Sequence, residues 1–187
     1  KKEHGIFFTP KNIVLETLSN IELNNYSKIL EPSFGEGIFI DEIISSNLIS
    51  PFTSVFGNEL DSNLYTESLI KYKEIPNLKL TNKNYLTEFE EDGFDLIIGN
   101  PPYGSKITKD DLKILKCDLR FQEFGYEPSV LFSIKALSQL KEGGRLVFIL
   151  PSTLLRVASF SNFRKYLKNN TRINRIINLH QSFPDVG

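Results

Sequence analysis

Short apolar runs alternate along this chain with segments of helical periodicity, and this alternation limits the possible folds more than any other feature. The segments predicted to be strands are Ser27–Leu30, Ser54–Leu60, Asn77–Tyr85, Phe94–Gly99, Arg145–Leu150 and Ile173–Leu179. The helical segments lie at residues 9–20, 38–44, 61–73, 128–140 and 160–168. This order predicts an α/β fold, in which a mainly parallel sheet is covered by helices on both faces.

Local signals predict where some of these elements begin and end. Thr9-Pro10 is typical of a helix start, with threonine as the N-cap and proline at the first helical position. Asp61 suits the same capping role for the helix that follows it. Gly143-Gly144 is expected to close the helix that begins at Pro128, and residues 104–127 predict a loop with one short helix.

The apolar run Phe94–Gly99 ends in the tetrapeptide Asn100-Pro101-Pro102-Tyr103. Two consecutive prolines stop a strand because neither can donate a hydrogen bond to the sheet. In an open α/β sheet, the loop after a strand's carboxyl end is where ligands bind. This loop opens with a planar amide and closes with an aromatic ring, the groups needed to hold and stack a flat nucleobase.

The chemistry of this tetrapeptide fits methylation of an exocyclic amine, whose lone pair is delocalised into its aromatic ring. If the Asn100 side-chain oxygen and the Pro101 carbonyl accept its two N–H groups, they favour a pyramidal nitrogen and stabilise developing positive charge. Tyr103 would stack on the base. A base in a duplex must first be flipped out, and because stacking contributes about 1–3 kcal/mol per ring, a second aromatic is expected opposite Tyr103.

The segment Glu31–Gly37 joins the first strand to a helix and is rich in glycine. Its glycines allow close backbone approach, and the helix N-terminus offers free amides to an anionic group. The segment lacks the glycine spacing of a dinucleotide site and the lysine of a P-loop. Glycines of this kind also make ordinary tight turns.

Polar residues follow the second and third strands as well. Glu59 stands 28 residues after Glu31, where a Rossmann-like site places an acid for ribose hydroxyls. Asn84-Tyr85 closes the third strand, so its amide could pair with an adenine edge while its ring packs on the adenine face. A turn at the end of the strand explains the same two residues.

Composition excludes several other kinds of site. The single cysteine, Cys117, rules out an internal disulfide and a cysteine-rich metal site, and two histidines, His4 and His180, argue against a histidine-built metal centre. No apolar run approaches the roughly 18 residues of a membrane span, and no signal-peptide apolar region follows Lys1. The expected compartment is therefore the cytoplasm, with no membrane partner.

The net charge of −1 hides an asymmetry along the chain. Residues 1–142 carry 15 basic and 22 acidic residues, whereas residues 143–184 carry no acidic residue. The basic residues of that second stretch are Arg145, Arg156, Arg164, Lys165, Lys168, Arg172 and Arg175. A basic end favours a polyanionic partner, and a helix with a solvated basic face explains it equally well.

Taken together, these loops resemble the adenine-N6 DNA methyltransferases of restriction–modification systems, in their gamma arrangement. The resemblance covers essentially the whole chain and implies a Rossmann-like class I methyltransferase fold with S-adenosylmethionine as cofactor. It implies double-stranded DNA as substrate, and a target-recognition domain or a specificity or restriction subunit as partner. Because the chain starts at Lys1 and contains no methionine, we expect it to be a fragment. The resemblance implies that residues 1–187 are the cofactor-binding and catalytic part, and that the sheet's last hairpin and the recognition domain are missing.

The resemblance also assigns cofactor contacts. Thr9 would contact the methionine carboxylate, Glu59 the ribose, and Leu60 and Pro102 the cofactor adenine. Asn84, with Tyr85, stands where the family usually has an aspartate and an aromatic, so it would accept from the cofactor's amino group without a charge. The main cofactor loop would supply Glu31, Pro32, Ser33, Phe34, Gly35 and Gly37.

On the substrate side, the resemblance implies that Asn100, Pro101 and Tyr103 handle the target base and that Phe183 is the second stacking aromatic.

Glutamine-N5 methyltransferases of release factors and some RNA methyltransferases carry the same tetrapeptide. Thr9-Pro10, the start of the cofactor loop and Phe183 favour DNA over both. Cytosine-C5 chemistry is excluded because Cys117 follows lysine rather than proline. A non-enzymatic domain that only presents DNA to a partner is the remaining alternative, and the intact tetrapeptide argues against it.

Overall fold

A parallel sheet flanked by helices organises the chain, as the alternating pattern predicts. The computed structural model describes residues 9–46 and 49–179. The strands in this part of the chain pair in the order β3-β2-β1-β4-β5, all in parallel. They are β1 (Lys28–Glu31), β2 (Ser54–Asn58), β3 (Leu78–Thr81), β4 (Phe94–Gly99) and β5 (Leu140–Phe148). Because the strand order reverses between β1 and β4, the ligand crevice of such a sheet lies at their carboxyl ends.

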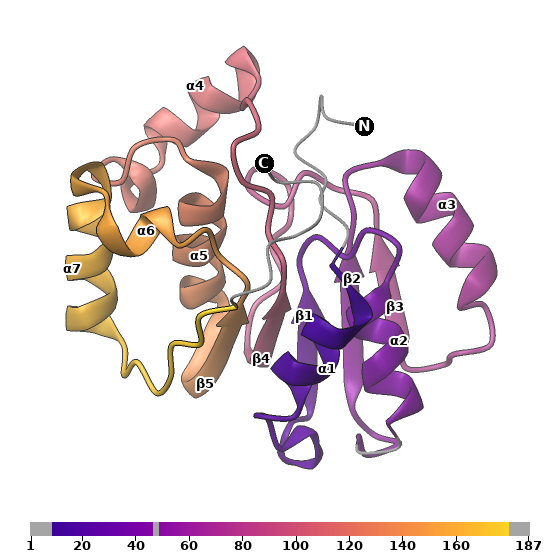
Figure 1. Ribbon diagram of the computed structural model, residues 1–187. Coiled ribbons are helices and arrows are strands. Elements are labelled where there is room, and N and C mark those ends of the chain that lie inside the picture. Colours follow the sequence, from indigo (N-terminus) through magenta and orange to yellow (C-terminus); the bar gives the residue numbers. More distant parts are fainter. Residues whose placement is uncertain (1–8, 47–48, 180–187) are drawn as a thin grey trace.

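Helices cover both faces of this sheet (Figure 1). The α-helices are α1 (Lys11–Leu18), α2 (Ile38–Ser45), α3 (Ser62–Lys71), α4 (Lys109–Cys117), α5 (Pro128–Gln139), α6 (Thr153–Arg156) and α7 (Ser161–Asn170). Short 3-10 helices lie at η2 (Leu23–Asn25), η3 (Leu119–Phe121) and η4 (Ala158–Phe160). Successive strand residues point to opposite faces, so Ile29 and Leu96 pack with the residues of α1 and α2, whereas Leu30 and Ile97 pack with those of α5.

The sequence predicts Asp61 and Thr9 as N-caps, and the structure confirms the first and not the second. Asp61 caps α3, because its Oδ1 accepts from the backbone amides of Asn63 (2.8 Å) and Leu64 (3.2 Å). The prediction for Thr9 is wrong: Pro10 occupies the N-cap of α1, and no side chain caps that helix. The Thr9 hydroxyl instead accepts a hydrogen bond from Asn100.

The carboxyl-terminal half of the fold differs from the sequence expectation at two places. Gly143-Gly144 lies within β5 rather than closing α5, where the pairing of β4 with β5 shifts register; Gly143 has a φ of +76°, which suits glycine in a bulge. The predicted strand Ile173–Leu179 is wrong within the described residues, because residues 172–179 pair with no strand there. Ile173 and Ile176 are 53% and 62% exposed.

Among the described residues, no helix has the length and apolar character needed to span a membrane. The same part of the chain holds no group of three or more histidine, cysteine or acidic side chains able to bind a metal ion.

Asp95 of β4 connects the amino ends of β1 and β4 to the start of β5 through hydrogen bonds. Its carboxylate accepts from the backbone amide and hydroxyl of Ser27 (3.0 and 2.6 Å), from the Lys28 amide (2.8 Å) and from Lys141 Nζ (3.0 Å). Partial burial raises the pKa of Asp95, but the hydrogen bonds from Ser27, Lys141 and Lys28 outweigh it and lower the pKa to about 2.

We predict that Asp95→Asn lowers the free energy of unfolding by about 1–3 kcal/mol at neutral pH, since it removes charge-assisted hydrogen bonds. An acid with a lowered pKa stabilises the folded state above its ordinary pKa, and this contribution is lost as pH falls toward about 2. Urea unfolding at neutral and acidic pH measures both effects. Asp110→Asn, at an exposed acid paired only with Lys113, is the control; equal loss in both variants would contradict the assignment.

Candidate functional site

The carboxyl ends of β1, β2 and β4 bring most of the predicted residues together at one edge of the sheet. Glu31 is the last residue of β1 and lies in register with Gly57 of β2. Gly99, the last residue of β4, adjoins it, since a β-carbon added to Gly99 would lie 3.5 Å from the Cγ of Glu31. The loops after these strands emerge at the top of the sheet in Figure 1.

The loop Glu31–Gly37 is shaped by its glycines. Gly37 is the N-cap of α2 with a φ of +81°, and a β-carbon there would collide with the hydroxyl of Tyr72. That hydroxyl donates to the Gly37 carbonyl (3.1 Å). Gly35, with a φ of +56°, turns its amide toward Glu59. Gly37 is therefore needed for close packing against Tyr72, whereas Gly35 is needed for its positive φ, since a β-carbon there would meet no atom within 4 Å.

Glu59 links this loop to the end of β2. Its Oε2 accepts from the Gly35 amide and its Oε1 from the Asp61 amide, each at 2.8 Å. A carboxylate oxygen accepts more than one hydrogen bond, so Glu59 keeps acceptor capacity for a diol. Leu60 beside it is 64% exposed and offers an apolar surface at the same edge.

Glu31 is a carboxylate buried at the centre of the site, with 3% of the residue exposed. Its Oε2 has no hydrogen-bond partner. Burial, and then the neighbouring carboxylate of Glu59, raise the pKa of Glu31 well above its ordinary value, although the Ile40 amide opposes this. A buried oxygen without a donor is costly, and it marks the place where a cationic donor would be stabilised.

Asn100 is the second centre of the site. Its Nδ2 donates to the Thr9 hydroxyl (3.1 Å), and its backbone carbonyl accepts from the Ser33 hydroxyl (3.3 Å). Its Oδ1 is buried without a partner, and among the described residues only the Oε2 of Glu31 shares that condition. Both buried side-chain atoms without a partner thus lie at this one edge of the sheet.

The remaining residues of the tetrapeptide line the same loop. Pro101 is buried, and Pro102 and Tyr103 are half-buried. Burial raises the pKa of the Tyr103 hydroxyl, and a hydrogen bond with the Asn100 side chain partly offsets it. Phe183 lies outside the described residues, so its proposed stacking role stays a prediction.

Three of the predicted contacts are placed differently from expectation. Phe34 is 2% exposed and packs in the core with Ile40, Val55 and Tyr72. Tyr85 is 1% exposed and donates to Gln139 Oε1 (2.5 Å), which corrects the prediction that its ring stacks on adenine. β3 ends at Thr81, and Asn84 lies in a turn where its Oδ1 accepts from the Leu86 amide (3.0 Å).

Sequence reasoning missed two asparagines that hold the loops in place. Asn58, 1% exposed, donates from Nδ2 to the carbonyls of Pro32 (3.3 Å) and Lys83 (3.0 Å). Asn82 donates to the carbonyls of Glu59 (2.7 Å) and Leu60 (3.0 Å). Both stand at or just past the carboxyl end of a strand, and that position is the signal that could have identified them.

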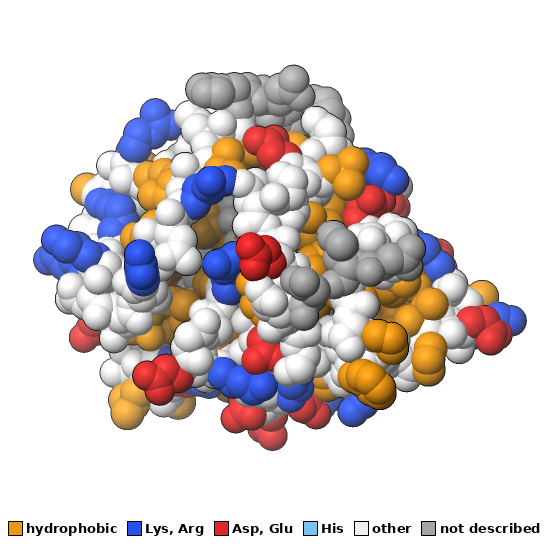
Figure 2. Space-filling model, turned by 90° about the horizontal axis from the view of Figure 1, so that it is seen from below, with side chains coloured by type: hydrophobic (Ala, Val, Ile, Leu, Met, Phe, Trp, Pro, Cys, Tyr) orange, Lys and Arg blue, Asp and Glu red, His pale blue; other side chains and the backbone are white. Residues whose placement is uncertain are grey.

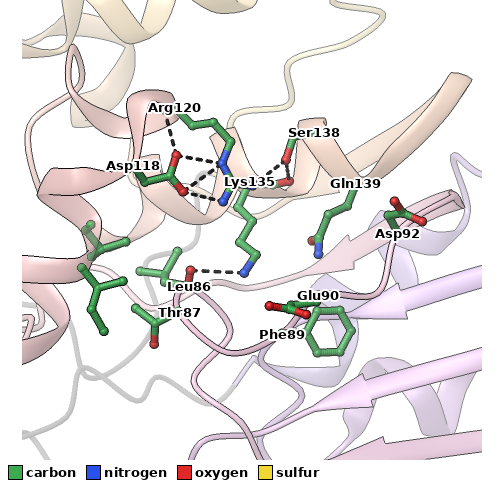
Figure 3. Close-up of a pocket in the computed structure, with 12 residues that line it drawn as sticks. Leu86, Thr87, Phe89, Glu90, Asp92, Asp118, Arg120, Lys135, Ser138 and Gln139 are labelled. Atoms are coloured by element: carbon green, nitrogen blue, oxygen red, sulfur yellow. Dashed lines mark hydrogen bonds and ion pairs between the residues drawn. The ribbon is translucent and has the colours of Figure 1, made fainter.

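A cavity of about 280 Å³ lies behind the turn that carries Asn84, between α5 and the β3–β4 connection (Figure 3). None of the described residues predicted for the site lines it. Lys135, buried on α5, donates to the Leu86 carbonyl (3.2 Å), and Gln139 donates to the Glu91 carbonyl (2.7 Å). Burial lowers the pKa of Lys135 to about 8. Lys135 and Gln139 therefore hold the β3–β4 connection against α5.

Comparison with known proteins gives a match over nearly the whole chain. The family model described as Eco57I restriction-modification methylase matches residues 15–183. The type II methyltransferase M.HincII of Haemophilus influenzae is 30% identical over 183 residues, which are 95% of this chain and 34% of that protein. The chain therefore spans about a third of the length of that relative.

Solved structures show the same fold. A Vibrio vulnificus protein assigned as a modification subunit of a type I restriction enzyme aligns with a TM-score of 0.71 and 22% identity, over 87% of this chain and 38% of that one. A Listeria monocytogenes protein assigned to the class I S-adenosylmethionine-dependent methyltransferases aligns with a TM-score of 0.69 and 21% identity, over 87% and 52%. The fold is the Rossmann-like class I methyltransferase fold.

We predict that Glu31→Gln raises the free energy of unfolding at neutral pH by about 1–3 kcal/mol, because it replaces an acid whose charged form is penalised by burial with a neutral amide. An acid whose pKa is raised on folding binds more protons in the folded state, so it makes stability fall as pH rises above its ordinary value of 4.5. The gain in the variant should therefore grow from acidic to neutral pH. Chemical denaturation across that range measures it.

The matched control is Glu36→Gln, which changes an exposed acid of the same loop. It should leave stability within about 0.5 kcal/mol of the unmodified protein, as surface substitutions do. A Glu31→Gln protein that is less stable than the control at neutral pH would contradict the buried-charge assignment.

Proposed function

The chain belongs to the Eco57I restriction-modification methylase family, and from this premise we propose that it carries the cofactor-binding and catalytic part of a site-specific DNA methyltransferase that methylates the N6 amino group of adenine. The observation that carries the proposal is the buried Oδ1 of Asn100, which has no hydrogen-bond partner. Asn100 lies against the loop Glu31–Gly37, since its carbonyl accepts from Ser33. An acceptor in this position is what an amine substrate requires.

S-adenosylmethionine, the cofactor of this fold, supplies a methyl group bound to a positively charged sulfur. The residues at the edge of the sheet fit it, because the unpartnered, buried carboxylate oxygen of Glu31 matches a cationic donor such as its ammonium group. Thr9 and the loop Glu31–Gly37 would hold the amino-acid end. Glu59 would hold the ribose, and Leu60, Asn84 and Pro102 would surround the adenine.

In the proposed mechanism, Asn100 Oδ1 and the Pro101 carbonyl accept the two N–H groups of the target amine. Both acceptors withdraw the nitrogen lone pair from conjugation, and they stabilise the positive charge that develops there. The hydroxyl of Ser33 anchors the Asn100 carbonyl, which fixes the loop against the cofactor side. Because the prolines restrict the backbone, the Pro101 carbonyl keeps its direction.

Adenine in a duplex must leave the stack before it can reach Asn100, and base flipping is part of the proposal. Tyr103 is half-buried beside Asn100, which suits a ring that stacks on an extruded base. Phe183 is proposed as the ring on the opposite face. A glutamine-N5 protein methyltransferase or an RNA adenine methyltransferase on the same fold is the alternative.

Double-stranded DNA is the proposed partner, read by a target-recognition domain C-terminal to this part or by a specificity or restriction subunit. The basic residues of the C-terminal stretch support contact with a polyanion. Lys165, Lys168, Arg172 and Arg175 are exposed. On the side of the molecule that holds α6 and α7, Figure 2 shows more lysine and arginine than acidic side chains.

The proposal is tested by incubating the full-length protein with labelled S-adenosylmethionine and, separately, unmethylated duplex DNA, RNA and a glutamine-containing release-factor protein. Mass spectrometry then identifies the methylated group. N6-methyladenine in DNA is the expected product. Methylglutamine or label confined to RNA would establish the alternative.

We predict that Asn100→Ala abolishes detectable methyl transfer while the affinity for S-adenosylmethionine changes by only a few-fold, because Asn100 faces the target amine. Methylation assays and calorimetric titration measure the two quantities. Asn63→Ala, at an exposed asparagine of α3, should retain both. A large loss of cofactor affinity in Asn100→Ala would mean that the residue belongs to the cofactor subsite.

A further inference from the structure

The side-chain amide of Asn100 has an accepting end and a donating end, and only one of its two orientations is productive. Its Oδ1 can accept a hydrogen bond, whereas its Nδ2 can only donate. An amine substrate brings two N–H donors, so the oxygen must face it. The nitrogen then points the other way, toward the Thr9 hydroxyl at 3.1 Å.

Thr9 is held firmly where it meets that nitrogen, although 91 residues separate the two in the sequence. Pro10 follows it at the N-cap of α1, and the Pro10 carbonyl accepts from the amides of Ile13 (3.0 Å) and Val14 (3.2 Å). The side chains of Ile13 and Val14 are 4% and 0% exposed. A helix anchored in the core by Ile13, Val14 and Leu18 therefore carries the Thr9 hydroxyl to the end of β4.

The rest of Asn100 is fixed independently of its amide. The Ser33 hydroxyl holds the backbone carbonyl (3.3 Å), and Pro101 follows directly, which restricts the backbone on its other side. The side-chain amide is the part that can still turn by half a revolution. In the orientation that the structure has, Nδ2 meets Thr9 and Oδ1 is left buried without a partner.

We infer that Thr9 is a positioning residue for the methyl transfer, and that its hydroxyl oxygen accepts the Asn100 Nδ2 donor so that Oδ1 is presented to the target amine. A threonine hydroxyl can do this because it accepts as well as donates. The Tyr103 hydroxyl oxygen is the other partner of the Asn100 side chain. Because Nδ2 carries two N–H donors, loss of the Thr9 acceptor would leave one of them buried and unpaired. This role rests on the proposed function, and it is separate from a contact of Thr9 with the cofactor.

Two substitutions separate the roles of shape and of hydrogen bonding. Thr9→Val keeps the shape of threonine and loses the acceptor, whereas Thr9→Ser keeps the hydroxyl and loses a methyl group. With saturating S-adenosylmethionine and target DNA, kcat of Thr9→Val should fall by about ten- to a hundredfold, as expected for an unpaired buried polar group. Thr9→Ser should stay within a few-fold of the unmodified enzyme.

A second readout needs no turnover. The side-chain NH₂ resonances of Asn100 in a ¹H–¹⁵N spectrum, assigned by their loss in Asn100→Asp, report the hydrogen bond directly. They should shift in Thr9→Val and change little in Thr9→Ser. Thermal unfolding establishes that each variant is folded, and Thr9→Ala replaces Thr9→Val if the latter is not.

The outcomes distinguish this inference from the function on which it rests. If kcat of Thr9→Val matches that of Thr9→Ser at saturating cofactor, or if the Asn100 resonances do not move, the positioning role is overturned. A Thr9→Val protein that loses only affinity for S-adenosylmethionine would still match the kcat of Thr9→Ser at saturating cofactor, and would therefore overturn the positioning role. If the unmodified full-length protein methylates no DNA, the proposed function fails, whereas the resonances still report whether Thr9 holds Asn100.

Discussion

The burial of one carboxylate, that of Glu31, is the constraint on which the rest of the site depends. It lies at the end of β1, beside β4 and under the start of α2, in the place where the sheet reverses its strand order. Nothing among the described residues donates to its Oε2, and the carboxylate of Glu59 adds repulsion. A folded chain keeps such a group only if the surrounding loops are held by other interactions.

Those other interactions are hydrogen bonds from asparagine side chains and backbone amides. Asn58 and Asn82 tie the loops after β1, β2 and β3 to one another, and Glu59 accepts hydrogen bonds from the backbone amides of Gly35 and Asp61. The network fixes the edge of the sheet while two acceptor atoms, on Glu31 and Asn100, stay without partners. The acceptor on Glu31 suits the ammonium group of the cofactor and the acceptor on Asn100 suits an amine, so the two atoms mark the cofactor side and the substrate side of the proposed N-methyltransferase site.

Much of this arrangement was predictable from the sequence, because the signals are local. The strand Phe94–Gly99 was predicted at its observed bounds, since a continuous apolar run ends in two prolines. Asp61 was predicted as a helix cap because it directly precedes a segment of helical periodicity. Thr9 and Tyr85 were misplaced because tertiary contacts decide their roles: Thr9 bonds a residue 91 positions away, and Tyr85 bonds Gln139 across the core. The apolar segment Ile173–Leu179 has a strand-like pattern, but pairing depends on a neighbour that local sequence does not specify.

The most direct test of this account is the proton balance of cofactor binding. Titration of the full-length protein with S-adenosylmethionine in buffers of different ionisation enthalpy gives the number of protons released. If the buried Glu31 is protonated in the free protein and charged against the cofactor, the unmodified protein should release more protons than Glu31→Gln, and the difference should shrink as the pH rises above the pKa of Glu31. Equal proton release by the two proteins at every pH would contradict the account.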